Sequence, residues 1–159
     1  MDGEYNNNLT FLPGDLLVSE FAELNFDAHL MVVQKNIGKW ANEAEVAGYD
    51  RIIAQLESIS NPEDFRGLAM DVHSPVAAIE PYLKNSEVVI VMAVEPGFGG
   101  QQFSEEAIKL IERLNEIRKE KKYKFKICAD GGIQKENLEI LGKAGADEVA
   151  VGVKRALLF

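Results

Sequence analysis

The chain has 159 residues, of which 47% are hydrophobic and 27% charged, a balance typical of a folded globular domain. Its formal net charge of -9 argues against nucleic acid or an anionic membrane as the main partner, because both require a basic surface. A single cysteine, Cys128, rules out an internal disulfide, and no apolar run reaches the roughly 18 residues of a membrane span. With no signal segment at its start, the chain is expected in a reducing cytoplasm.

The two ends of the sequence differ from those of an ordinary α/β domain. Residues 1–16, MDGEYNNNLTFLPGDL, contain turn-forming residues and three consecutive asparagines before any full strand. At the other end, RALLF follows directly after the last apolar run. An α/β domain ordinarily begins with a strand and ends with a helix that covers the sheet. We therefore expect the first strand and the last helix of the fold to be missing.

From residue 26 onward, short apolar runs alternate with amphipathic runs. The apolar runs are rich in Val, Ile, Leu, Met and Ala, which is typical of parallel strands buried on both faces. The predicted strands cover 26–33, 51–57, 67–72, 87–94, 125–129 and 148–153, and the predicted helices cover 35–47, 75–84, 104–121 and 134–144. The segment 58–66 has room for only one turn, near Asn61. This alternation predicts a single α/β domain over residues 1–159, either a barrel or an open doubly wound sheet.

The helix predicted over 104–121 has the clearest pattern. Ser104 is its expected N-cap, and two glutamates lie in its first turn. The residues expected to form its apolar stripe are Ile108, Ile111, Leu114 and Ile117.

Two glycine-rich turns follow predicted strands. PGFGGQQF at 96–103 lies between a strand and a helix, where backbone amides and the helix N-terminus favour an anion, although an ordinary turn has the same composition. ADGGI at 129–133 is a second such turn, and Gly152 ends the next strand. Together they match the phosphate site that barrels form after strands seven and eight. Lys154 and Arg155 either add charge to that site or are solvated cations.

Asp130 and His29 are the candidate chemical groups. Asp130 ends its strand and is either a functional carboxylate or the N-cap of the next helix. His29 lies within an apolar strand and is either a ligand or a hydrogen-bonded core residue. Strand alternation places His29 on one face with Asp27 and Met31. An imidazole and a carboxylate at strand ends could share a divalent metal such as Zn, Fe or Mn.

Four motifs carry a resemblance to a known family: HLMV at 29–32, VMAVEPGFGGQQF at 91–103, CADGGI at 128–133 and AGADEVAVG at 144–152. In order and spacing, nearly the whole chain resembles the ribulose-phosphate 3-epimerases. The resemblance implies an incomplete (β/α)8 TIM barrel that binds a phosphorylated ketose and a divalent metal (Zn, Fe, Mn or Co). It also implies inversion at C3 through an enediolate, converting D-ribulose 5-phosphate to D-xylulose 5-phosphate in the pentose phosphate pathway.

The resemblance also assigns site residues. His29 matches a metal-binding histidine that contacts substrate, and Asp130 matches the aspartate that binds metal and exchanges a proton. The other residues expected to line the substrate and its phosphate are Met31, Met92, Gly97, Phe98, Gly99, Gly100, Gly131, Gly132, Gly152 and Val153.

The chain departs from the family pattern at several positions. It starts at the methionine of the motif His-x-Asp-x-Met-Asp-Gly, so a second metal histidine, a second catalytic aspartate and a strand with a substrate-binding serine are expected to be absent. Gln55 replaces an expected histidine, and Val153 replaces an expected serine. We therefore expect little epimerase activity from this chain by itself. The alternatives are an inactive phosphate-binding or assembly subunit, or an epimerase of another ketose phosphate. Unpaired strand edges would favour a homo-oligomer.

Overall fold

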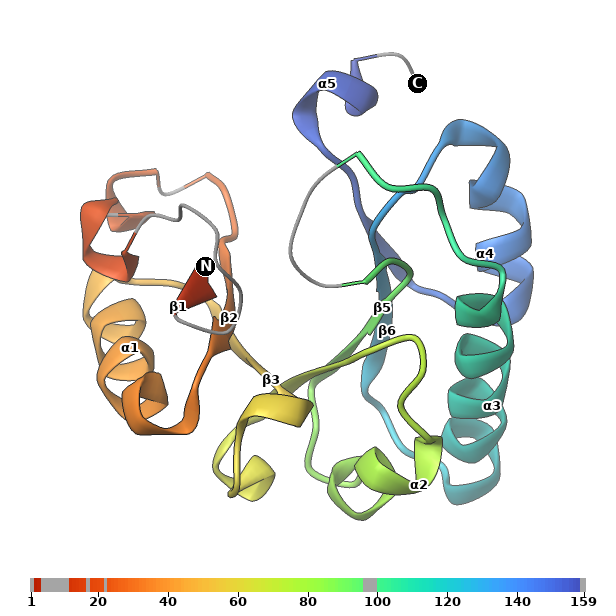
Figure 1. Cartoon of the computed structure of the whole chain (residues 1–159), viewed down its shortest axis with the longest axis horizontal. Helices are drawn as coiled ribbons and strands as arrows, with labels where there is room; N and C mark the ends of the chain where they lie inside the picture. Colours follow the sequence, from red (N-terminus) through yellow and green to blue (C-terminus); the bar gives the residue numbers. More distant parts are fainter. Residues whose placement is uncertain (1, 4–11, 17, 22, 96–99, 158–159) are drawn as a thin grey trace. The chain divides into compact units, whose positions relative to one another are not determined.

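The computed structural model describes residues 2–3, 12–16, 18–21, 23–95 and 100–157 (Figure 1). Contacts within the chain define two compact units, Met1–Ala69 and Met70–Phe159. The strands within each unit are parallel and follow the order of the sequence, with helices between them. This topology is that of a partial (β/α)8 barrel, as predicted. Its folding as a single domain stays a prediction.

The first unit contains one long helix and four parallel strands, of which the fourth ends at the first residue of the second unit. The strands are β1 (Asp2–Gly3), β2 (Asp27–Val32), β3 (Arg51–Gln55) and β4 (Gly67–Met70), and α1 (Gln34–Ala47) connects β2 to β3. Short 3-10 turns are η1 (Pro13–Asp15), η2 (Val18–Glu20), η3 (Leu56–Ser58) and η4 (Pro62–Asp64). The single turn expected near Asn61 is confirmed by η4. The two-residue strand β1, which pairs with the end of β2, was not predicted.

Alternation along β2 separates the core of this unit from its candidate site. Every second residue of β2 is fully buried and packs against α1. The buried cluster comprises Ala28, Leu30, Val32, Ile37, Trp40, Ala44 and Ala54. Asp27, His29 and Met31 occupy the intervening positions and are more exposed. They therefore share the face of the strand that is turned away from α1, as the alternation predicts.

The second unit contains three parallel strands and the helices that follow them. The strands are β5 (Val88–Met92), β6 (Lys126–Asp130) and β7 (Glu148–Ala150). The helices and 3-10 turns are α2 (Val76–Ile79), η5 (Glu80–Tyr82), α3 (Glu106–Lys121), η6 (Lys135–Asn137), α4 (Leu138–Ala144) and α5 (Val153–Ala156). All five residues of β5 are buried, and so is Cys128 in β6. The six strands predicted from the sequence are therefore confirmed, with shorter ends except in β6, which lies one residue later than predicted.

The helices differ from the predictions mainly in length. α3 begins two residues later than predicted, and its N-cap is Glu105 instead of Ser104, although the Ser104 hydroxyl accepts a hydrogen bond from the Glu106 N–H (3.3 Å). The helix predicted over 75–84 is only four residues long and continues as the 3-10 turn η5. Pro81 lies within that turn, and proline cannot donate the backbone hydrogen bond that an α-helix needs. Among the described helices, none is long and apolar enough to cross a membrane.

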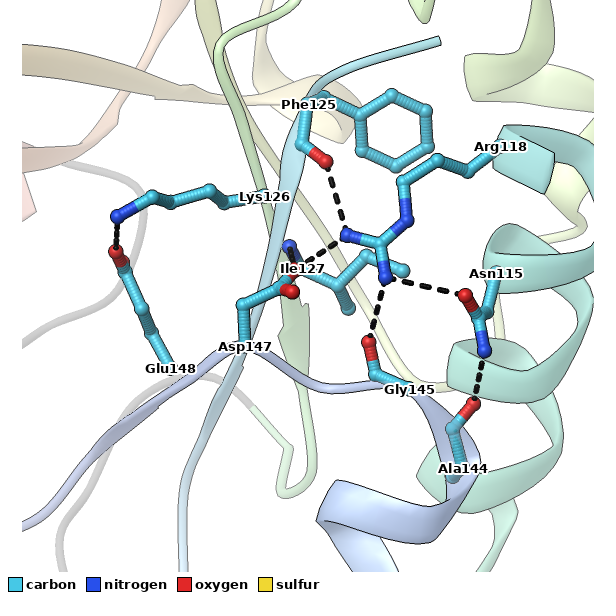
Figure 2. A network of polar contacts seen from close by, with 9 residues as sticks. All are labelled: Asn115, Arg118, Phe125, Lys126, Ile127, Ala144, Gly145, Asp147 and Glu148. Atoms are coloured by element: carbon cyan, nitrogen blue, oxygen red, sulfur yellow. Dashed lines mark hydrogen bonds and ion pairs between the residues drawn. The ribbon is translucent and has the colours of Figure 1, made fainter. Parts of the chain in front are cut away.

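Arg118 joins three elements of the second unit (Figure 2). Its Nη1 donates to the Phe125 carbonyl (3.0 Å) and to the Asp147 carboxylate. Its Nη2 donates to the Asn115 side-chain oxygen (3.1 Å) and to the Gly145 carbonyl (3.0 Å). Only 17% of the Arg118 side chain is exposed. The guanidinium thus fixes the end of α3 against the start of β6 and against the loop between α4 and β7.

Candidate active site

Asp130 is the last residue of β6, the strand that pairs with both β5 and β7. In register it lies beside Met92 of β5 and Ala150 of β7. Its carbonyl accepts a hydrogen bond from the Ala93 N–H (2.6 Å), which holds the end of β6 against the segment after β5. Asp130 therefore stands at the carboxyl end of the central strand of this unit, the end where barrels carry their catalytic residues.

The environment of Asp130 suits it for proton exchange. Burial raises the pKa of its carboxyl group above the ordinary 3.8, and a hydrogen bond from the Gly131 N–H opposes this shift. A carboxylate with a raised pKa is a stronger base than a solvated one. The alternative in which Asp130 caps the following helix is wrong. The next helical turn begins only at Lys135, and its cap is Gln134, whose N–H donates to the Asn137 side chain.

The turn after Asp130 depends on two glycines with positive φ. Gly131 has φ +111° and Gly132 has φ +67°, a backbone region that favours glycine. A Cβ on Gly132 would lie 2.5 Å from the backbone nitrogen of Phe103. The ADGGI turn therefore packs directly on the end of the first glycine-rich turn, at Gln102 and Phe103.

The other predicted glycines differ in how firmly the structure requires them. Gly100 has φ +88°, but a Cβ there would meet no atom within 4 Å. Gly152 is exposed, has open space around its Cβ position, and precedes Val153, which begins α5 and is also exposed. Gly97, Phe98 and Gly99 lie outside the described residues.

His29 lies at the third position of β2, in the first unit. Its Nε2 lies 2.9 Å from the Gln55 side-chain oxygen. Burial lowers the pKa of His29 from 6.5 to about 4, and the hydrogen bond to Gln55 opposes this shift. The imidazole is therefore neutral near pH 7, which is the form that binds metal ions. His29 is therefore hydrogen-bonded, as one of its two interpretations predicts, but it lies outside the buried cluster, and its role as a ligand stays a prediction.

Sequence reasoning identified Gln55 only as a departure from the family and missed its contacts. Its side-chain nitrogen donates to Glu57 at 2.6 Å, so that His29, Gln55 and Glu57 form one hydrogen-bonded chain. The available signal was a glutamine in an apolar strand, since a buried amide needs partners. Gln55 is fully buried.

The two residues predicted to bind a divalent metal belong to different units. His29 belongs to the first unit and Asp130 to the second. A neutral imidazole and a carboxylate are donors that Zn, Fe and Mn accept, so these two residues fit the predicted metal. Within the described ranges, no three His, Cys, Asp or Glu side chains gather as a metal-binding group. A metal shared by His29 and Asp130 stays a prediction.

The two methionines assigned to the site occupy strand positions that suit the prediction. Met31 lies two residues after His29 on the same face of β2 and is half-buried. Met92 ends β5, is 3% exposed, and lies in register with Asp130. The structure thus places Met31 with His29 and Met92 with Asp130, one pair in each unit.

Parallel strands, intervening helices and a carboxylate followed by two glycines at a strand end define a (β/α)-barrel protein. The model of the ribulose-phosphate 3 epimerase family matches residues 1–155. A ribulose-phosphate 3-epimerase of Methanocaldococcus jannaschii is 35% identical over 92% of this chain and 66% of its own length. One from Aquifex aeolicus is 32% identical over 96% of this chain and 72% of its own length. The chain therefore belongs to the ribulose-phosphate 3-epimerase family, a family of isomerases. It spans about two thirds of the length of these relatives.

Proposed function

We propose that this chain carries acid–base and metal-binding residues of a ketopentose-phosphate 3-epimerase, which interconverts D-ribulose 5-phosphate and D-xylulose 5-phosphate. The observation that carries the proposal is Asp130, a carboxylate of raised pKa at the end of a barrel strand, directly before two glycines of positive φ. The names of the relatives support the same reaction. We further propose that it acts in the cytoplasm in carbohydrate metabolism, where its buried free thiol, Cys128, would stay reduced.

The proposed mechanism assigns one task to each group. Asp130 removes the proton from C3, or returns it, on one face of the sugar. His29 and Asp130 would hold the divalent metal, which when bound stabilises negative charge on the substrate oxygens. The backbone amides around Gly132 would bind the phosphate and fix the position of C3 relative to Asp130. Inversion also requires a second acid on the opposite face of the sugar.

Proton exchange at C3 tests this role of Asp130 without requiring complete turnover. The 159-residue chain is incubated in D2O with either pentulose phosphate and Mn²⁺ or Zn²⁺, and loss of the C3–H signal is followed by NMR. Exchange is expected from at least one epimer. Asp130→Asn should slow it by about 10²–10⁴-fold. The control is Glu136→Gln, which changes an exposed carboxylate six residues further on and should leave exchange unchanged. No exchange from either epimer with the wild-type chain would contradict the proposal.

A second candidate function is phosphate binding without turnover. Two departures in the chain favour it: Gln55 stands where the resemblance expects a histidine, and Val153 where it expects a serine hydroxyl. This function predicts that inorganic phosphate and pentulose phosphates bind while C3–H does not exchange. The same NMR experiment, repeated with other ketose phosphates, separates this function from an epimerase of different specificity.

A further inference from the structure

Three side chains of the first unit are linked to one another by consecutive hydrogen bonds. His29 comes from β2, Gln55 from the end of β3, and Glu57 from the turn η3 that follows. Pairing of β2 with β3 places His29 opposite Ile53, so that Gln55 lies two residues further along the neighbouring strand. His29 Nε2 is 2.9 Å from Gln55 Oε1, and Gln55 Nε2 is 2.6 Å from Glu57 Oε2. Gln55, the middle one of the three hydrogen-bonded residues, is fully buried.

The chemistry of these groups sets the direction of each hydrogen bond. The Glu57 carboxylate only accepts, so the amide nitrogen of Gln55 must face it. The amide oxygen of Gln55 therefore faces His29, and because this oxygen also only accepts, His29 Nε2 must carry the proton. A neutral imidazole has one N–H, so its Nδ1 carries the lone pair.

We infer that Gln55 and Glu57 are positioning residues that hold His29 in the Nε2–H tautomer and thereby make Nδ1 its metal-binding atom. The metal-binding part of this inference rests on the proposed function, whereas the tautomer rests on the hydrogen bonds from His29 to Gln55 and from Gln55 to Glu57. A histidine at position 55 could either donate to His29 or accept from it. An amide that is held by a carboxylate can only accept. Gln55 therefore specifies the tautomer, and partners of this kind contribute substantially to metal affinity.

NMR of the imidazole nitrogens tests the tautomer directly. The 159-residue chain, labelled with ¹⁵N-histidine, is observed at pH 7 without added metal. The chain has only two histidines, and His73→Asn removes the second, whose exposed ring lies between Glu95 and Glu106. We expect His29 to show a protonated Nε2 and an unprotonated Nδ1. A protonated Nδ1, or an average of the two tautomers, would overturn the inference.

Substitutions separate positioning from a general structural role. Gln55→Leu should abolish the tautomer preference and weaken Zn²⁺ binding by about 10–100-fold. Glu57→Leu should act in the same direction, because it removes the group that orients the amide. Glu57→Gln keeps an acceptor for the Gln55 nitrogen, so it should preserve both the tautomer and Zn²⁺ affinity. Circular dichroism checks that each variant folds, and competition with a chromophoric chelator measures the affinity.

The two measurements distinguish failure of the inference from failure of the proposed function. If Gln55→Leu folds and retains the Nε2–H tautomer, Gln55 does not position His29 and the inference is overturned. If the wild-type chain shows the expected tautomer but takes up no Zn²⁺, the metal-binding part fails together with the proposed metal site. The positioning of His29 by Gln55 and Glu57 would then still hold.

Discussion

Gly132 and Phe103 approach each other so closely that a Cβ on the glycine would lie 2.5 Å from the backbone nitrogen of Phe103. The contact joins the turn after β6 to the segment that precedes α3. Glycine at 132 is therefore required for packing, in addition to any role in binding a ligand.

We expect Gly132→Ala to lower the free energy of unfolding by about 2–3 kcal/mol, because it combines a left-handed backbone with a steric clash against the main chain. Chemical denaturation measures the loss. The control is Gly142→Ala in α4, where a Cβ would meet no atom within 4 Å and where alanine should stabilise the helix by about 0.5–1 kcal/mol. An equal effect of the two substitutions would contradict the packing role of Gly132.

Phosphate should bind among the backbone amides of Gly100, Gly132 and Gly152. In a titration of the chain with inorganic phosphate, the amide NMR signals of these glycines should shift together with a single dissociation constant. Gly152→Ala provides a specific test, because the space around Gly152 is open and the fold should tolerate the methyl group. Weaker phosphate binding with unchanged stability is the expected result. Shifts confined to other parts of the chain would place the anion elsewhere.

Asp130→Asn should increase stability while it abolishes C3 exchange. The pKa of Asp130 is raised in the folded chain, so the folded state binds this proton more tightly than the unfolded state does. Above pH 3.8, the ordinary pKa of the group, the ionised carboxylate therefore lowers the free energy of unfolding, and this loss grows as pH rises. Urea unfolding at pH 7 should show a higher midpoint for the variant, and this gain should shrink as pH falls toward 3.8. A less stable variant at pH 7 would contradict the argument.

His29 should make the stability of the chain depend on pH in the opposite sense. Its pKa falls from 6.5 to about 4 on folding, so the unfolded state binds more protons between these values. The contribution of His29 to the free energy of unfolding is complete above pH 6.5. It is lost as pH falls toward 4, by about 3 kcal/mol in total. The difference between the wild-type chain and His29→Gln, measured by urea unfolding across this interval, isolates the histidine from the many carboxylates. If the difference in stability between the two proteins does not vary with pH, the lowered pKa of His29 is contradicted.

Loss of Arg118 should destabilise the second unit. Arg118→Leu leaves Asp147, Asn115 and two backbone carbonyls without their shared donor, and the expected cost is about 2–4 kcal/mol. Arg113→Leu is the matched control, because Arg113 forms an exposed ion pair with Glu116 on the same helix. Its expected effect is within about 0.5 kcal/mol. Thermal unfolding of the two variants compares these costs.

The sequence predicted the parts of the fold that depend on local pattern. The strands β2 to β7 and the helices α1 and α3 follow from apolar periodicity, and the position of Asp130 follows from the glycines after it. The short helix α2 was predicted too long, because the apolar pattern continues through Pro81 whereas the α-helical hydrogen bonds do not. Strand β1 was not predicted, because two residues are too few to show a period.

The hydrogen bond of His29 could not be predicted from the sequence, for a different reason. Alternation along β2 correctly separated His29 from the residues that pack on α1. Its partner Gln55 depends on the register between β2 and β3, which a single sequence does not specify. The Arg118 network likewise joins residues up to 29 positions apart through loops of irregular backbone.

The chain contains one tryptophan and one cysteine, and they belong to different units. Trp40 is 8% exposed in the core beside α1, and Cys128 is 7% exposed in β6. Fluorescence during denaturation therefore reports on the first unit, while the reaction of the thiol with a coloured reagent reports on the second. Coincident curves would show that the halves melt cooperatively, and separate midpoints would show that each melts on its own. The native sequence thus supplies an intrinsic probe for each half, and neither requires an engineered label.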